Sequence, residues 1–440
     1  MSRLTSTRFR RLSREFFWVG LGQTATVVGA VVGVRILTGV LPPDAYGRLA
    51  LGMTVATLVT QTVLGPLGNA ATRFFAPARE ADALWSYLAA VKGLLVQATG
   101  GVLLLAVVLC LGLVATGYSQ WIGLALAAML FALLSGYNSV LNGMQNAARQ
   151  RAIVALHHGL ATWGRFLLAA ALVLWVGASS TFAMLGYAGA MIIVLASQGW
   201  FFRRTLPSCG WPACLEGNTQ KGRWRTGILT YAWPFGVWGL PAWVQLASDR
   251  WALQGFASID DVGRYAVLYQ LGYYPITICT NLMVQLVSPV FFQRAGDASD
   301  RSRLERVYRL NRTLTIAALV FTGIATLAAY ALHEWVVRFL VASQYRTISW
   351  LLPGMVLAGG LFAGGQLAVV SLLSGVQTRA LILPKVATAV LGVLLNVVGA
   401  AFYGIPGVVA AMVVAATGYL LWIQSLAMVR HRQVQAEAAK

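Results

Sequence analysis

A chain of 440 residues of which 58% are apolar and only 10% charged has too few polar side chains to cover a soluble globular protein. Its 33 Lys and Arg outnumber its 13 Asp and Glu, and the formal charge of +20 raises nucleic acid as a partner. The basic residues lie mostly between long apolar stretches, however, which is typical of membrane topology. We therefore expect an integral membrane protein that has no nucleic-acid partner.

The apolar stretches are long enough to cross a bilayer, because a hydrocarbon core of about 30 Å takes about 20 mostly apolar residues as a helix. They are continuously apolar, as at 101–113, which favours helices over the alternating strands of a barrel. The predicted fold class is an all-α integral membrane protein with about 12 transmembrane helices. The predicted spans are 15–40, 48–72, 84–115, 121–146, 152–176, 181–202, 227–255, 264–293, 313–332, 348–375, 381–403 and 405–429.

The first predicted span, 15–40, follows a basic segment and is expected to be retained. It is too long for the apolar core of a signal peptide, and no small-residue cleavage site follows it. Basic residues also concentrate at 203–225 and 294–312. By the positive-inside pattern, these segments and both chain termini are predicted to be cytoplasmic.

Two short segments recur in the second half of the chain, in the same order, which indicates an internal repeat. Residues 44–48, Asp-Ala-Tyr-Gly-Arg, resemble 260–264, Asp-Asp-Val-Gly-Arg. Residues 139–145 and 371–377 share Ser, Leu, Gly and Gln at matching positions. Six predicted spans precede the second copy, so both halves enter the membrane from the same side and are expected to be parallel repeats.

The repeat divides the chain into two lobes around a central cavity. Residues 1–202 form the predicted N-terminal six-helix lobe, and 227–440 form the C-terminal one. The cytoplasmic linker, 203–226, breaks the apolar pattern with Pro207, Pro212 and a polar cluster. No metal or other cofactor is expected, because the cysteines and histidines show no zinc-ligand spacing and no phosphate-binding loop is present.

The two repeated turns carry the same charged residues. Asp44 and Asp260 are each predicted to cap the helix that follows, by accepting hydrogen bonds from its backbone N–H groups. Each turn ends in an arginine, Arg48 or Arg264, for which two interpretations stay open. The arginine either anchors the chain at the membrane interface or lines the mouth of a cavity.

Five ionisable residues stand out within predicted spans, where a charge costs on the order of 2.5–3.5 kcal/mol and normally faces a bundle interior or a watery cavity. They are Arg35, Lys92, Arg165, Asp249 and Arg250. The four cations either snorkel or pair structurally, or they bind an anionic headgroup. In the second case Arg35, Lys92 and Arg165 would form a cationic chamber in the N-terminal lobe, and Arg250 would face Arg35 across the gap between the lobes. Arg35 and Arg250 occupy equivalent positions in the two halves to within one residue.

Asp249 is the one acid of the chain that lies clearly within a predicted span. A local salt bridge to Arg250 would neutralise both residues and weaken the case for Arg250 as an anion ligand. The alternative is that Asp249 couples transport to a proton or a sodium ion. Both interpretations stay open at this point.

Span 227–255 contains residues that remove backbone hydrogen bonds or loosen packing, which are Pro234, Gly236, Gly239 and Pro241. A bend is expected there, and Pro275 and Pro289 are expected to bend the next span in the same way. Whether the bend in span 227–255 acts as a gating hinge stays open.

Residues 41–50, Leu-Pro-Pro-Asp-Ala-Tyr-Gly-Arg-Leu-Ala, resemble the turn after the first helix of bacterial polysaccharide transporters, the Wzx-type flippases. Residues 69–74, Asn-Ala-Ala-Thr-Arg-Phe, and 141–149 are similar to that family's segments at the ends of spans two and four. The same superfamily contains multidrug and toxin extruders and lipid II flippases. Because these motifs are structural turns, they identify the fold better than the cargo.

The resemblance implies a flippase, not an enzyme, in the bacterial inner membrane. It would move a polyprenyl-pyrophosphate-linked oligosaccharide to the outer leaflet for cell-surface polysaccharide, such as the O-antigen of lipopolysaccharide. Its partners would be that substrate, membrane lipids and other polysaccharide-assembly proteins. One alternative is a cation-coupled multidrug antiporter, and Asp249 would be its coupling carboxylate. The other is a membrane glycan polymerase or ligase, which the absence of a large outer loop and of paired carboxylates disfavours.

Overall fold

The computed structural model describes residues 20, 22, 24–204, 206, 218–296, 300–375 and 379–438. Every regular element among these residues is a helix, and none is a strand. Nine of the described helices are long and apolar enough to cross a membrane. The prediction of an all-α membrane protein is therefore confirmed. The N-terminal basic segment, most of the linker with Pro207 and Pro212, and Gln377 lie outside the described residues.

The chain divides into two compact units, Met1–Trp243 and Val244–Lys440, which we call the N-terminal and C-terminal units. The boundary falls inside one long helix, α8. The elements up to that boundary are helix Thr24–Val40, α2 Pro43–Val59, the π-helix η1 Thr60–Leu64, α3 Gly65–Glu80, α4 Leu84–Ala115, η2 Ser119–Trp121, α5 Ile122–Ala147, α6 Arg151–Val176, α7 Ser180–Arg203 and α8 Asn218–Phe256.

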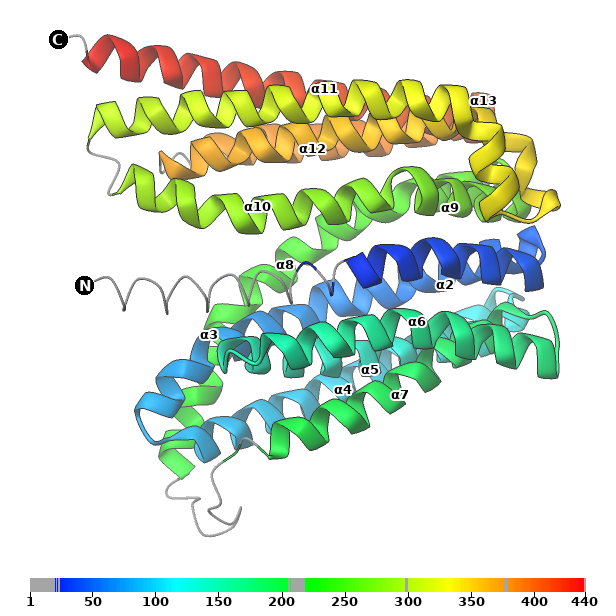
Figure 1. Ribbon diagram of the computed structural model, residues 1–440. Helices are drawn as coiled ribbons and strands as arrows, with labels where there is room; N and C mark the ends of the chain where they lie inside the picture. The colour runs from blue at the N-terminus through cyan, green and yellow to red at the C-terminus, as the bar shows by residue number, and fades with distance from the viewer. Residues whose placement is uncertain are drawn as a thin grey trace. The chain divides into compact units, whose positions relative to one another are not determined.

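The C-terminal unit contains the end of α8 and the remaining helices (Figure 1). These are α9 Ile259–Gly272, α10 Tyr274–Ala295, α11 Arg301–Leu340, η3 Ser343–Leu351, α12 Leu352–Ser374, η4 Arg379–Leu381 and α13 Ile382–Ala438. The division between α9 and α10 falls at Tyr273, two residues before Pro275, whose missing N–H and bulky ring disturb the helical pattern in the preceding turn. Gly404 interrupts α13 with a φ of 59° that glycine tolerates, between the last two predicted spans.

The count of twelve crossings stays a prediction. Helix Thr24–Val40 is shorter than the nine candidate spans, and α8 is not among them. The stretch Ile382–Gln433 counts once although Gly404 divides it.

One helix lies at the centre of each unit. In the N-terminal unit α5 packs against α2, α3, α4, α6 and α7, and in the C-terminal unit α12 packs against α9, α10, α11 and α13. The described parts of the two repeated segments, 139–145 and 371–375, fall at the ends of these two helices. Glycines let the neighbours of α12 approach closely, since a Cβ at Gly360 would overlap the side chain of Thr322 of α11 and one at Gly365 would lie 2.6 Å from Tyr419 of α13.

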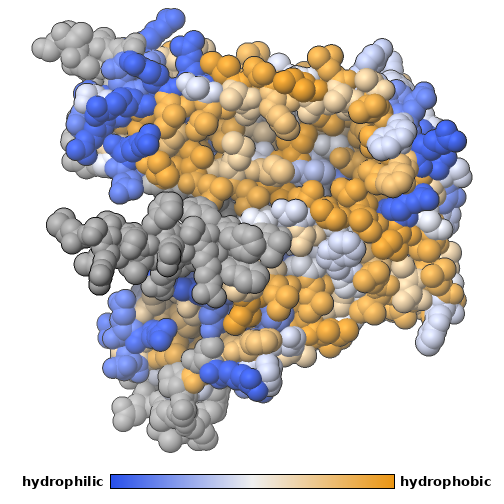
Figure 2. All heavy atoms as spheres, viewed as in Figure 1, coloured by the Kyte–Doolittle hydropathy of each residue, from blue (hydrophilic) through white to orange (hydrophobic). Residues whose placement is uncertain are grey.

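Other helices present large apolar side chains outward. In α4 only 11% of the residues in its most apolar 18-residue stretch are buried, and the share in α11 is also 11%. Leu104 of α4 is 65% exposed and Phe321 of α11 is 71% exposed. In Figure 2, hydrophobic residues cover the middle of the helices and hydrophilic residues gather at their ends. This distribution matches a protein whose helices are surrounded by lipid.

The π-helix η1 interrupts the second predicted span, and Pro66 explains it. Proline has no N–H, and its ring crowds the carbonyl four residues earlier, so the α pattern cannot continue past Thr62. The N–H of Gly65 bonds to the carbonyl of Thr60 instead, one residue beyond the α-helical partner. Such single π turns are common at functional sites.

Two glycines of α8 pack against this π-helix. A Cβ at Gly236 would lie 2.8 Å from the carbonyl oxygen of Thr62, and one at Gly239 would lie 2.5 Å from that of Gln61. The helical backbone of α8 continues through Pro234 and Pro241. The glycines therefore permit close packing within the N-terminal unit, while a role as a gating hinge stays a prediction.

The predicted capping roles of Asp44 and Asp260 are wrong. Helix α2 begins earlier than expected, because Pro43 suits the first helical turn, and its N-cap is Pro42, with no side-chain cap. In α9 the N-cap is Ser258, whose hydroxyl accepts a hydrogen bond of 3.1 Å from the N–H of Asp261. Asp44 and Asp260 lie in the first turns, where a carboxylate still interacts favourably with the helix dipole.

Candidate functional site

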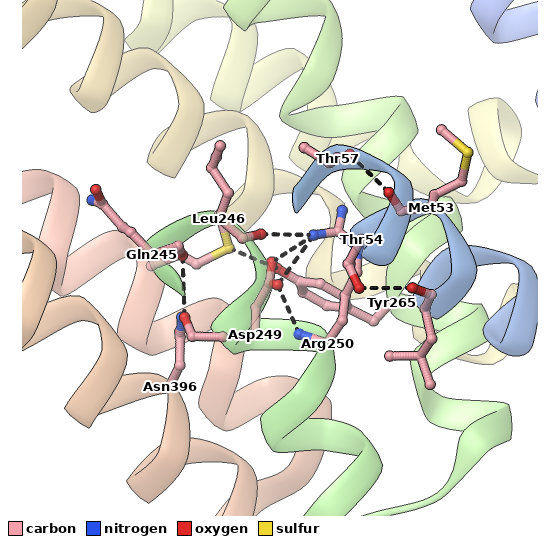
Figure 3. Close-up of polar contacts among 12 residues, drawn as sticks. Met53, Thr54, Thr57, Gln245, Leu246, Asp249, Arg250, Tyr265 and Asn396 are labelled. Atoms are coloured by element: carbon pink, nitrogen blue, oxygen red, sulfur yellow. Dashed lines mark hydrogen bonds and ion pairs between the residues drawn. The ribbon is translucent and has the colours of Figure 1, made fainter. Parts of the chain in front are cut away.

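A buried ion pair lies near the end of α8, in the C-terminal unit (Figure 3). The Arg250 guanidinium donates to both carboxylate oxygens of Asp249, at 3.1 and 3.3 Å, and to the carbonyl of Leu246 at 3.1 Å. The side chains of Arg250 and Asp249 are 14% and 6% exposed, respectively. Adjacent residues on a helix do not normally face each other, but the long arginine side chain folds back. The predicted local salt bridge is confirmed.

Tyrosines of α9 complete the surroundings of this pair. The hydroxyl of Tyr265 donates to Asp249 Oδ2 at 2.6 Å, and the backbone N–H of Arg250 donates to Oδ1 at 2.7 Å. The guanidinium lies over the ring of Tyr269, 4.5 Å from its centre. Both charges are thus compensated, as a buried ion pair requires. Arg250 is not an open cation in this arrangement.

Helix α13 also reaches the pair. Asn396 donates a hydrogen bond of 2.9 Å to the hydroxyl of Ser248, next to Asp249, and Met412 Sδ lies 2.9 Å from the Tyr265 hydroxyl. Asn396 Oδ1 is buried and has no hydrogen-bond partner. The structure therefore leaves one buried acceptor open on the residue that bonds to Ser248, the chain neighbour of Asp249.

We expect Tyr265→Phe to destabilise the C-terminal unit, because it removes one donor from a buried carboxylate. A hydrogen bond to a charged group contributes about 1.5–3 kcal/mol, so a loss of that size is expected in thermal unfolding of the purified protein in detergent. Tyr274→Phe is the control, since the structure gives the Tyr274 hydroxyl no hydrogen bond to a described residue. Equal stability of the two variants would contradict the assigned role of Tyr265.

A row of aromatic rings leads away from the ion pair, and the sequence analysis missed it. Tyr269 stacks on Tyr273 with ring centres 4.9 Å apart, and Tyr273 lies 6.4 Å from Phe362 of α12. Phe362 in turn stacks on Tyr419 of α13 at 5.3 Å, and the Tyr419 hydroxyl bonds to Gln366. Tyr265 and Tyr269 of α9 and its C-cap residue Tyr273 recur every four residues, which was the available signal.

Arg165 is half-buried on α6 of the N-terminal unit. Its guanidinium lies 4.8 Å from the ring centre of Phe166 and 5.7 Å from that of Tyr187 on α7. Its Nε is buried without a hydrogen-bond partner. Aromatic rings stabilise this cation, but its donors are not all used.

Arg35 is exposed on helix Thr24–Val40, which packs alongside α6. Trp163 of α6 donates a hydrogen bond of 3.1 Å to the carbonyl of Ala25, and a Cβ at Gly33 would clash with the ring of Phe166. These contacts place Arg35 within about one turn of Arg165 along the helix axes, where one turn is about 5.4 Å.

The other two predicted cations lie elsewhere. Lys92 is exposed on α4, which packs against α3 and α5. Arg250 belongs to the C-terminal unit and is paired with Asp249. Of the four predicted headgroup ligands, the structure therefore brings only Arg35 and Arg165 onto neighbouring helices at a similar level.

The arginines of the repeated turns are held by local acids. Arg48 lies 3.6 Å from Asp44 and stands over the ring of Trp121 at 5.9 Å. Arg264 lies 3.3 Å from Asp261. Both pairs are partly exposed and each contributes little to stability. The geometry favours anchoring, and a role at the mouth of a cavity stays a prediction.

A buried network of four amide side chains joins α5 to α7, and it too was missed. Asn138 donates to Gln198 at 2.6 Å, Asn142 donates to Asn138 at 2.9 Å, and Gln198 donates to Asn142 and Gln145 at 2.5 and 2.6 Å. None of the four residues is more than 9% exposed. The amides at positions 138, 142 and 145 follow helical spacing on α5. Such a network fixes the register of the two helices.

No group of three His, Cys, Asp or Glu among the described residues is placed to hold a metal ion. Cys209 and Cys214 lie outside the described residues.

Comparisons with known proteins relate this geometry to one family. A family model described as "Polysaccharide biosynthesis protein" matches residues 12–294. Among solved structures, the chain is similar to an inward-facing multidrug resistance MATE family transporter of the MOP superfamily. That match has a TM-score of 0.67 at 14% identity and covers 96% of this chain and 99% of the other.

Two further solved structures show the same fold. The lipid II flippase MurJ in its inward closed conformation matches with a TM-score of 0.65 at 14% identity, over 92% of this chain and 86% of its own. A mutant of the Vibrio cholerae MATE transporter VcmN matches with a TM-score of 0.54 at 15% identity, over 96% and 98% of the two chains. A search of curated protein sequences finds no match.

Proposed function

The chain belongs to the polysaccharide biosynthesis protein family, and on that premise we propose that it flips a polyprenyl-pyrophosphate-linked oligosaccharide across the bacterial inner membrane. The observation that carries the proposal is the family match over residues 12–294. The shared fold with transporters and with a lipid II flippase supports it. In this proposal both termini are cytoplasmic, and other polysaccharide-assembly proteins supply and consume the glycan.

The anionic pyrophosphate would bind to cations of the N-terminal unit. Arg35 is exposed, and Arg165 keeps an unused donor at a similar level on the neighbouring helix. Guanidinium groups hold phosphate oxygens bidentately, which makes this pair the core of the proposed site, with Lys92 as a third cation. Arg250, the fourth predicted ligand, belongs to the C-terminal unit, and its Nη1 donates to both carboxylate oxygens of Asp249, so it would be available to an anion only when that pair opens.

We expect the triple variant Arg35→Gln, Lys92→Gln, Arg165→Gln to lose more than about a hundredfold in flipping rate. Each lost charge-assisted hydrogen bond contributes about 1.5–3 kcal/mol, and 1.4 kcal/mol is a factor of ten. The measurement is the appearance of lipid-linked oligosaccharide in the opposite leaflet of proteoliposomes.

The matched control removes three exposed arginines of α11, as Arg303→Gln, Arg309→Gln, Arg338→Gln. It changes the net charge by the same amount and should keep wild-type transport. If the variant that lacks Arg35, Lys92 and Arg165 flipped the substrate at the wild-type rate and at equal protein level, these three cations would be excluded as the headgroup site.

A cation-coupled antiporter is the second candidate, and one observation favours it. Asp249 is a carboxylate buried within the membrane-spanning part of the chain, as ion coupling would require. If the purified protein exported a cationic dye down a proton or sodium gradient, and Asp249→Asn abolished that export, the glycan proposal would be abandoned.

A further inference from the structure

A cavity of about 250 Å³ lies within the C-terminal unit, among α11, α12 and α13. Its lining includes Asn311, Arg312, Thr315, Ser371, His431 and Arg432. The beginning of α11 and the end of α13 lie at the same end of the unit (Figure 1). The positive-inside pattern predicts this end to be cytoplasmic. None of the residues of the transport site described above lines this α11–α13 cavity.

Positive charge lines the cavity, and no described side chain compensates it. Arg312 and Arg432 are exposed, neither forms an ion pair with a described residue, and no acid is among the lining residues. The acids at the start of α11 are engaged elsewhere, because Asp300 pairs with Arg303 at 3.2 Å and Glu305 pairs with Arg309 at 2.8 Å. Hydrogen bonds from the Ser302 hydroxyl and from the N–H of Arg303 hold the pKa of Asp300 below its usual range, so it stays ionised in its own pair. The cavity therefore favours an anion.

The buried part of the cavity offers acceptors rather than donors. Asn311 is 3% exposed, Thr315 0% and Ser371 1%. The Thr315 hydroxyl donates to the Asn311 carbonyl at 2.9 Å, and the Ser371 hydroxyl donates to the Ala368 carbonyl at 2.8 Å, so their oxygens remain free to accept. Asn311 directs its Nδ2 to the Ala368 carbonyl, and its buried Oδ1 has no partner. A ligand hydroxyl group would satisfy these acceptors.

We propose that the α11–α13 cavity binds a hydroxyl-bearing anionic phosphate headgroup. The phosphate lies between Arg312 and Arg432, and the hydroxyl groups reach Asn311, Thr315 and Ser371. Pockets for drug-sized ligands measure about 300–1,000 Å³, so this smaller cavity suits a headgroup and not an oligosaccharide. A phosphoglycerol headgroup meets the charge and hydroxyl requirements together. Because the cavity lies at the end of membrane-spanning helices, a phospholipid is the expected source of this headgroup. A soluble phosphate ester would offer the same chemistry, and the experiment below distinguishes the two.

The test uses the full-length protein, purified in detergent and depleted of lipid. Its thermal stability is followed while phosphatidylglycerol, phosphatidylethanolamine or soluble glycerol 3-phosphate is added. Phosphatidylglycerol is expected to stabilise the wild type in a saturable way, and the zwitterionic lipid is not. In Arg312→Gln, Arg432→Gln the half-saturating concentration should rise at least about tenfold, as the loss of two charge-assisted contacts predicts. The control, Arg294→Gln, Arg306→Gln, removes the same charge from two exposed arginines near the same end of the unit, which form no ion pair with a described side chain, and it should leave the titration unchanged.

The arms of the experiment separate the sources of the ligand. Stabilisation by phosphatidylglycerol alone assigns a lipid, and an equal effect of glycerol 3-phosphate assigns a soluble phosphate ester. Asn311→Leu should weaken the response to phosphatidylglycerol or to glycerol 3-phosphate, because it removes an acceptor for the ligand hydroxyl groups. Phosphatidic acid lacks the glycerol hydroxyls of phosphatidylglycerol and should therefore bind Asn311→Leu and the wild type equally. The titrations of the wild type do not depend on whether any variant folds. Equal stabilisation of the wild type by phosphatidylglycerol and by phosphatidylethanolamine would therefore be enough to overturn the proposal. So would a phosphatidylglycerol response that Arg312→Gln, Arg432→Gln leaves intact.

Discussion

Asp249→Asn alone should destabilise the purified protein by about 3–5 kcal/mol, whereas adding Arg250→Gln should restore most of that loss. The single change leaves a guanidinium that is only 14% exposed without its counter-ion, and the second change removes the unpaired charge. Replacing a buried pair as a whole is often close to neutral, while removing one partner is costly. Thermal unfolding of the four proteins in detergent, analysed as a double-mutant cycle, measures the coupling directly.

The same cycle separates a structural role of Asp249 from ion coupling. If the pair is structural, transport should recover together with stability in the double variant. If Asp249 exchanges a proton or cation, transport should stay lost although stability returns. A single Asp249→Asn variant as stable as the wild type would show that the ion pair is not closed in the protein, against the geometry of Figure 3.

The ion pair could be predicted from the sequence because its two partners are adjacent and because charges within apolar spans are rare. The donor that completes it, Tyr265, was not, since it lies on the next helix and its position depends on how α8 and α9 pack. The same reason hid the α11–α13 cavity, whose residues come from three helices. Hydropathy locates spans, but it does not specify which faces of those spans meet.

Local chemistry was misjudged where two signals competed. A carboxylate in a turn before a helix suggests a cap, yet in the first repeated turn Pro43 started the helix ahead of Asp44. In the second, Ser258 took the capping position ahead of Asp260. Pro66 signalled an interrupted helix within the second predicted span, and that signal was overlooked. In each case proline or serine decided the local geometry.

Gly186→Val should prevent α6 and α7 from packing and reduce the yield of folded protein sharply, with a cost above about 3 kcal/mol. A Cβ at Gly186 would overlap Cα of Ala169 and lie 2.5 Å from its N, and backbone atoms cannot rotate away as a side chain can. Three residues later, a Cβ at Gly189 would meet only Leu168 Cδ1 at 3.9 Å, so Gly189→Val makes the same change on the same helix and should be tolerated. Monodisperse elution in size-exclusion chromatography and the melting temperature report the difference.

Because α7 also carries Gln198 of the buried amide network, a separation of α6 and α7 that shifts α7 would disturb its register with α5. Equal behaviour of the two variants would mean that the close contact between these helices is not a property of the folded protein.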